Sequence, residues 1–115
     1  MTDQKKKEIQ RAVARMDKLE TDWNSDLQIA TATGRIALAG PVLKLREREE
    51  ELASREVPEC LSKGKTAFLA HMRASIQAFT SFMADQEYTS SAYMLEAAKQ
   101  IETYNKSKVQ CEKLL

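Results

Sequence analysis

The sequence has few residues that interrupt helices. Three glycines, two prolines and 6% aromatic residues are spread over 115 positions. Abundant Ala, Leu, Glu, Lys, Gln and Met accompany them, and these residues lose little side-chain freedom in a helix. The composition gives strands little support. We therefore expect one domain over residues 1–115 with an all-α fold.

The chain also lacks an excess of charge of either sign. Its 18 Lys and Arg nearly balance its 17 Asp and Glu, so no overall field would attract nucleic acid or an anionic membrane. The short basic run Lys5–Lys7 is typical of a solvated terminus. Aromatic residues are not interleaved with basic ones, as single-stranded nucleic-acid binding requires. No nucleic-acid partner is expected.

Long hydrophobic runs are missing as well. No segment approaches the ~18 to 20 apolar residues that cross a bilayer, and the amphipathic "EIQRAVARMDKLE" after the lysines is not a signal peptide. Met1 is either the native start or a start codon placed on a processed, exported domain. The compartment must be inferred from the cysteines.

The residues that carry most cofactor chemistry are scarce. His71 is the only histidine, and no cluster of His, Cys and carboxylates has zinc-binding spacing. The "SKGKT" segment resembles a phosphate-binding loop, but Glu59 occupies the position of its first glycine and no strand precedes it. Cys60 and His71 lie about three helical turns apart, beyond hydrogen-bond reach. We expect no cofactor, no metal, no catalytic residue and hence no enzyme.

Helical periodicity dominates the first half of the chain. The apolar and small residues recur in steps of three, four or seven, which predicts one long helix over about residues 3–55. A kink near Ala37 to Pro41, centred on Gly40-Pro41, or a brief interruption of the helix is expected, because proline removes a backbone hydrogen bond and clashes with the preceding turn. The stripe consists of Ile9, Val13, Met16, Trp23, Leu27, Ala30, Gly34, Leu38, Val42, Leu45 and Leu52.

A helical hairpin is predicted for the second half. Val57-Pro58 ends the first helix, because the residue before a proline avoids the α region. The two hairpin helices are expected over residues 59–85 and 91–113. Candidate caps for the last helix are Thr89, Ser90 and Ser91. The side of this helix expected to face the core comprises Met94, Ala97, Ala98, Ile101, Tyr104 and Cys111.

These elements predict an antiparallel bundle of three or four helices. If the first helix folds back at Gly40-Pro41, the bundle has four helices. If that helix stays extended, its N-terminal arm projects and needs a partner for its apolar stripe.

Cys60 and Cys111 are expected to form a disulfide. With the hairpin turn near Gln86-Glu87, the two cysteines lie at nearly the same level on antiparallel helices. A closely packed helix pair can supply the Cα separation of ~4.4 to 6.8 Å that a disulfide needs. Such bridges persist in oxidising compartments, so the pair favours an exported protein.

Several short motifs resemble those of small helical bacterial lipoproteins and periplasmic proteins of unknown function. In those proteins a Val-Pro-x-Cys-Leu element begins a hairpin and a cysteine closes it. The resemblance implies a periplasmic or otherwise exported location and no particular activity. A lipidated cysteine near the N-terminus is missing, which leaves lipid anchoring open. The matching residues are Val57, Pro58, Cys60, Leu61, Phe79, Phe82, Met83 and Cys111.

Three hypotheses about function arise from this sequence. The first is a non-enzymatic exported domain that binds a protein partner or itself, through the surface of Ile9, Val13, Met16 and Trp23. The second is a carrier of a small ligand or metal. The third is a cytoplasmic adaptor with free thiols. The carrier's pocket in the bundle core would be formed by His71, Met72 and Tyr104.

Overall fold

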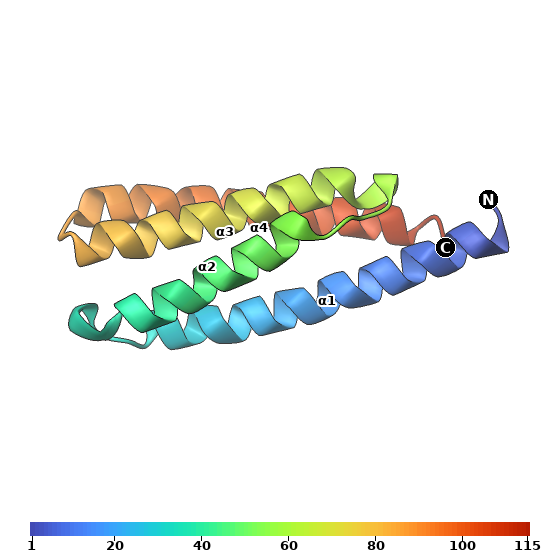
Figure 1. Ribbon diagram of the computed structural model, residues 1–115. Coiled ribbons are helices and arrows are strands. Elements are labelled where there is room, and N and C mark those ends of the chain that lie inside the picture. Colours follow the sequence, from blue (N-terminus) through green and yellow to red (C-terminus); the bar gives the residue numbers. More distant parts are fainter.

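The computed structural model describes residues 1–115 and consists of four α-helices and two short 3₁₀ turns (Figure 1). The helices pack into an antiparallel bundle, which confirms the predicted all-α fold. In chain order the elements are α1 (Asp3–Thr31), η1 (Arg35–Ala37), α2 (Ala39–Ser54), η2 (Glu59–Leu61), α3 (Ser62–Met83) and α4 (Glu87–Glu112).

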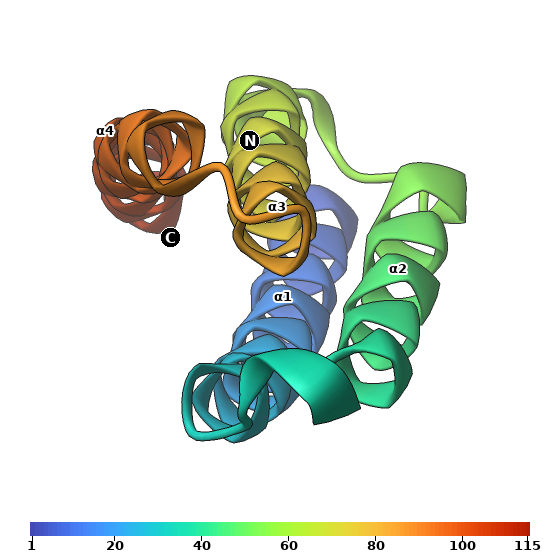
Figure 2. The same cartoon turned by 90° about the vertical axis from the view of Figure 1, so that its left-hand side faces the viewer.

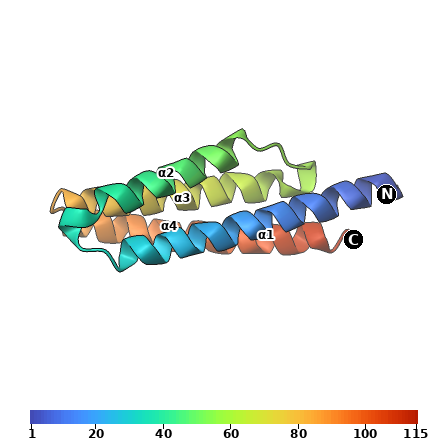
Figure 3. The ribbon, with the colours of Figure 1, turned by 60° about the horizontal axis from the view of Figure 1, so that its bottom comes forward.

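The bundle is a rod with two unlike ends. Its extents are 52 × 22 × 20 Å, and both chain termini lie at the same end (Figures 1 and 3). We call this the terminal end; the α2–α3 connection, residues 55–61, lies toward it. The opposite end carries the α1–α2 connection, residues 32–38, and the α3–α4 turn, residues 84–86. We call it the turn end, and Figure 2 looks onto it.

The chain folds back within residues 3–55, which confirms the four-helix alternative, but it does so between two separate helices and not at a kink in one long helix. The chain leaves the helix after Thr31 and re-enters one at Ala39, so the break comes before Gly40-Pro41 rather than there. Pro41 lies in the first turn of α2, where its missing N–H costs no hydrogen bond. The α1–α2 connection therefore makes a complete reversal, and the bundle has four helices.

The periodic stripe did not reveal this break because it continues in phase across it. Ala30, Leu38 and Val42 are all buried, although Leu38 follows a reversal of the chain. At the end of α1, the hydroxyl of Thr31 donates a hydrogen bond to the carbonyl of Leu27 at 2.8 Å, so one of the last carbonyls of the helix has a side-chain partner. A continuous helix and the observed seven-residue connection would therefore place the same residues in the core.

The hairpin of α3 and α4 is confirmed, with tighter ends than expected. The turn needs only three residues, because Asp85 adopts a left-handed conformation with φ 62° and Gln86 donates its N–H to the carbonyl of Ser81. The last helix then begins at Glu87 instead of Ser91. Ser90 lies inside it, and its hydroxyl donates across the hairpin to the carbonyl of Ala78 at 2.8 Å.

One continuous hydrophobic core runs along the rod. Its largest members come from all four helices, so no helix pair has a core of its own. On α4, by contrast, Met94 and Ala98 are exposed although they were expected inside, because this helix buries only a narrow side. The largest fully buried side chains include Trp23, Tyr104, Phe68, Ile9, Met16, Leu45, Leu52, Leu61 and Met72.

Candidate interaction surface

Large apolar side chains are exposed around the turn end. Ile36, in η1, is fully exposed, and Tyr88 in the first turn of α4 is 96% exposed. Exposed apolar patches on a monomeric protein commonly mark sites of interaction. We call the following set the turn-end patch: Ile29, Ile36, Leu43, Tyr88, Met94 and Leu95.

The three chain segments that meet at the turn end are almost free of charge. Charged residues make up 30% of the sequence, yet residues 74–84 and 88–95 contain none. Residues 27–43 contain only Arg35. This uneven distribution is visible in the sequence itself, and it is the signal that could have located the patch.

Arg35 is paired with two carboxylates, so the cluster around it has a net charge of −1. Its Nε donates to the carbonyl of Phe82 at 2.9 Å, and its guanidinium lies 4.3 Å from the centre of the Phe82 ring. The carboxylates of Asp85 and Glu87 lie 3.3 and 3.8 Å from its terminal nitrogen. The one charged side chain of residues 27–43 therefore fastens the α1–α2 connection to the α3–α4 turn.

A small pocket of about 230 Å³ opens beside the patch. Three of its wall residues carry hydroxyls, and each donates its proton to a main-chain carbonyl: Thr31 to Leu27, Thr33 to Ile29 and Ser90 to Ala78. The wall offers no free hydroxyl proton to a ligand, so the pocket suits an apolar group. It is lined by Ala30, Thr31, Thr33, Leu38, Ala78, Phe79, Phe82, Ser90 and Met94.

The interaction surface predicted from the sequence is wrong. Ile9, Val13, Met16 and Trp23 are at most 8% exposed, because α1 packs its stripe against the rest of the bundle. The prediction assumed that a long first helix might project, and the reversal at residues 32–38 removes that possibility. No apolar stripe on α1 is left for a partner.

His71, Met72 and Tyr104 also belong to the packed core. Met72 and Tyr104 are completely buried and His71 is 7% exposed, so these residues do not line the turn-end pocket. The ring of Phe68 packs against the rings of His71 and Tyr104. The distances between ring centres are 6.2 Å to His71 and 4.7 Å to Tyr104. Tyr104 has no hydrogen-bond partner for its hydroxyl, and burial raises its pKa.

Both nitrogens of His71 are engaged in hydrogen bonds. Trp23 donates its indole N–H to Nε2 at 3.0 Å, so Nδ1 carries the proton and donates to the carbonyl of Ala97 at 2.8 Å. These bonds join α1, α3 and α4. Burial lowers the pKa of His71, although the Ala97 carbonyl and Glu20 favour its charged form. The neutral ring has no free lone pair for a metal ion.

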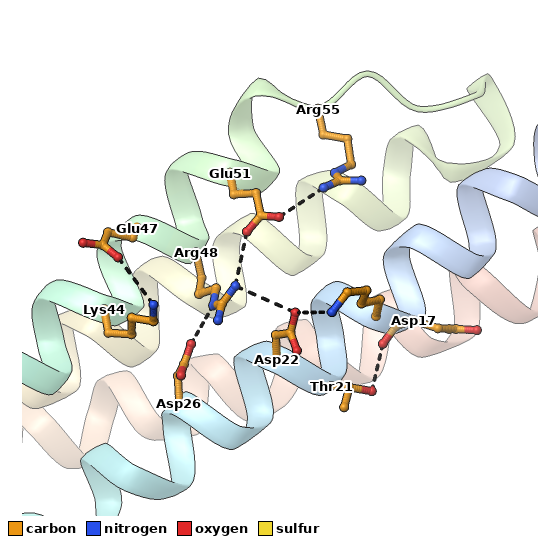
Figure 4. A network of polar contacts seen from close by, with 10 residues as sticks. Asp17, Thr21, Asp22, Asp26, Lys44, Glu47, Arg48, Glu51 and Arg55 are labelled. Atoms are coloured by element: carbon orange, nitrogen blue, oxygen red, sulfur yellow. Dashed lines mark hydrogen bonds and ion pairs between the residues drawn. The ribbon is translucent and has the colours of Figure 1, made fainter.

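The charged cluster around Arg48 holds two helices together and offers no site for a ligand. Arg48 of α2 contacts Asp26 of α1 at 2.6 Å, and this hydrogen bond raises the pKa of Arg48 (Figure 4). Asp22 and Glu51 surround the same guanidinium at 3.8 and 3.5 Å. The charges are paired across the α1–α2 interface. No three or more His, Cys, Asp or Glu side chains gather in a way that could hold a metal ion.

The cysteines come together as predicted. Cys60 in η2 and Cys111 in the last turn of α4 lie at disulfide distance, with their Cα atoms 5.2 Å apart. Near this pair the helices α3 and α4 approach closely at Gly64, where an added Cβ would lie 3.2 Å from the hydroxyl oxygen of Ser107. The two cysteines close the hairpin at its terminal end.

None of the helices has the length and apolar character that crossing a membrane requires. A scan against known protein families, a search of curated proteins and a search of solved structures each find no match. The resemblance to bacterial periplasmic proteins therefore stays a prediction, and the function must be argued from the turn end.

Proposed function

We propose that this chain is a non-enzymatic helical domain that binds another protein chain through its turn end. The observation that carries the proposal is the convergence of three segments with a single charged residue, Arg35, and six exposed apolar side chains on one end of a highly charged rod. The only other charges in this region are Asp85 and Glu87, which pair with Arg35. The cores of protein interfaces are depleted of charge and rich in apolar and aromatic side chains. The turn end has this composition.

The carrier hypothesis has less support. A pocket of about 230 Å³ is smaller than the ~300 to 1,000 Å³ typical of small-molecule sites. An apolar cavity of ~150 Å³ can hold a single benzene ring, so this pocket has room for one bulky side chain of a partner. The core residues proposed as the alternative site are packed against one another. The pocket's volume therefore fits a single anchoring side chain of a partner protein better than a separate small ligand.

We further propose that the domain works in an oxidising compartment, as an exported protein does. The support is the cysteine pair, whose separation matches that of structural disulfides. Alkylating the protein inside intact cells and counting free thiols after unfolding tests this. No free thiol is expected; two free thiols would instead favour the cytoplasmic adaptor.

Binding at the turn end can be tested by site-specific photocrosslinking in the cells that make the protein. A photoreactive residue at Ile36 should form discrete adducts, and Tyr88→Asp with Leu95→Asp should abolish them by placing charge on the patch. The matched control is Val109, which is 49% exposed on α4 outside the patch. Equal crosslinking from both positions, unaffected by the charged variants, would refute the proposal.

A further inference from the structure

The turn end carries both a projecting side chain and a recess. Ile36 is fully exposed in η1, between Thr33 and Leu38, which both line the pocket. The knob therefore lies in the chain between two residues that line the hole. A knob and a hole on the same end of the molecule can serve two copies of the same chain.

The recess accepts the chemistry of that knob. Its hydroxyl protons are already donated to main-chain carbonyls, and six of its nine wall residues are hydrophobic. An aliphatic side chain needs no hydrogen bond, whereas a polar one would leave its acceptors unpaired. The volume of about 230 Å³ is sufficient for one side chain of this size.

Symmetry gives the second argument. In a two-fold contact each residue near the axis faces its own copy, so a charged residue there would meet a like charge. Residues 27–43 contain only Arg35, and its two partners Asp85 and Glu87 leave one net negative charge on each turn end. Like-charge repulsion between two turn ends is therefore limited to one net charge on each copy. The flanks of the rod carry many more charges.

We infer that two copies of this chain associate end to end, each placing Ile36 in the turn-end pocket of the other. The inference rests on the proposed function and names the partner of the same surface. Each pocket would be completed by a residue of the second copy. Ile36, which has no contact to make within its own chain, becomes the anchor.

The contact would be weak. A cross-section of 22 × 20 Å offers on the order of 400 Å² per copy, about half of the ~800 Å² per partner in a standard interface. We expect a dissociation constant on the order of 10⁻⁴ M, with rapid exchange between monomer and dimer. Such a dimer would respond to local concentration.

Sedimentation equilibrium of the full chain, from about 10 μM to about 1 mM, tests the inference. The average mass should rise above 13.0 kDa as concentration increases. Ile36→Ser removes the knob and Ala78→Leu fills the hole, so each variant alone should remain monomeric. Val109→Ser, outside the patch, should associate like the wild type. If Ala78→Leu does not fold, Thr31→Leu fills the pocket from α1.

Mixing the two variants gives the most specific readout. One intact knob and one intact hole meet only in the mixed pair, so the mixture should associate more strongly than either variant alone. A loss of fold in the variants would not produce this complementation. A wild type that is monomeric at the highest concentration, or an Ile36→Ser variant that still associates, overturns the inference. Crosslinks from Ile36 to a different protein would then leave the proposed function standing.

Discussion

The two ends of the rod use their side chains in opposite ways. At the terminal end, Cys60 and Cys111 close the hairpin, and Lys65 donates to the carbonyls of Arg55 and Ala53 at 2.6 and 3.3 Å. At the turn end, Ile36 is fully exposed, although Arg35 beside it holds the α1–α2 connection to the α3–α4 turn. The cysteine link and the proposed anchor Ile36 therefore lie at opposite ends of the bundle. Substitutions at the two ends should have different consequences.

The largest effect on stability is expected at the terminal end. Replacing Cys60 and Cys111 together with alanine removes a link that closes a segment with a sequence separation of 51. Without the link the unfolded chain gains conformational entropy, which should lower the free energy of unfolding by about 4 kcal/mol. Urea denaturation measures this, and reduced wild-type protein is the matched control. An unchanged midpoint in both samples would contradict the contrast between the ends.

The middle of the rod should make stability depend on pH. The pKa of His71 is lowered by burial, while in the unfolded chain it is near 6.5. Above pH 6.5, His71 is neutral in both the folded and the unfolded chain, and its contribution to stability is fully present. As pH falls below 6.5 the unfolded chain binds a proton that the folded chain resists, so stability decreases until the folded pKa is reached.

The proton would also break a specific contact. Protonated Nε2 can no longer accept the indole N–H of Trp23. Urea unfolding at a series of pH values, followed by the fluorescence of this only tryptophan, measures the effect. His71→Gln keeps one acceptor and one donor without titrating, so its stability should vary less between about pH 7 and pH 5. An equal slope in both proteins would exclude this role for His71.

A smaller effect of opposite sign is expected for Tyr104. Its hydroxyl is buried without a hydrogen-bond partner, so Tyr104→Phe removes an uncompensated polar group. The free energy of unfolding should rise by up to about 1 kcal/mol. Tyr93→Phe, on the half-buried side of the same helix, is the control and should be nearly neutral. Clear destabilisation by Tyr104→Phe would mean that the hydroxyl has a partner after all.

The smallest effect on stability is expected at the turn end. Ile36→Ser with Leu43→Ser should change the free energy of unfolding by no more than about 0.5 kcal/mol, because both side chains are exposed. The same variant should lose binding at the turn end. Urea denaturation and sedimentation of one sample measure both properties. A large loss of stability would show that the ends are not divided as described.

Much of the architecture can be predicted from residue periodicity and register. The spacing of the apolar residues in the α3–α4 segment determines which side faces inward, and counting from the turn places Cys60 beside Cys111. These predictions succeed because antiparallel helices have a fixed rise per residue. The reversal at residues 32–38 could not be predicted in this way. Its buried residues keep the same spacing as a continuous helix would.

The proposed binding surface was not predicted from the sequence for a related reason. Periodicity detects side chains that are apolar and buried, and it selected Ile9, Val13, Met16 and Trp23, which the bundle itself covers. Exposed apolar residues such as Ile36 do not follow the helical period of the core. Charge depletion over residues 27–43 does mark the region, but its importance depends on knowing that three segments converge there.

The position of the two termini has a practical consequence. Because both lie at the same end, anything joined to either one holds the rod by its terminal end and leaves the turn end free. A molecule that is immobilised on a surface or tethered in a fusion would thus expose its turn end to the solution. The proposed end-to-end contact would then form between molecules on facing surfaces and not between neighbours on one surface, which point the same way.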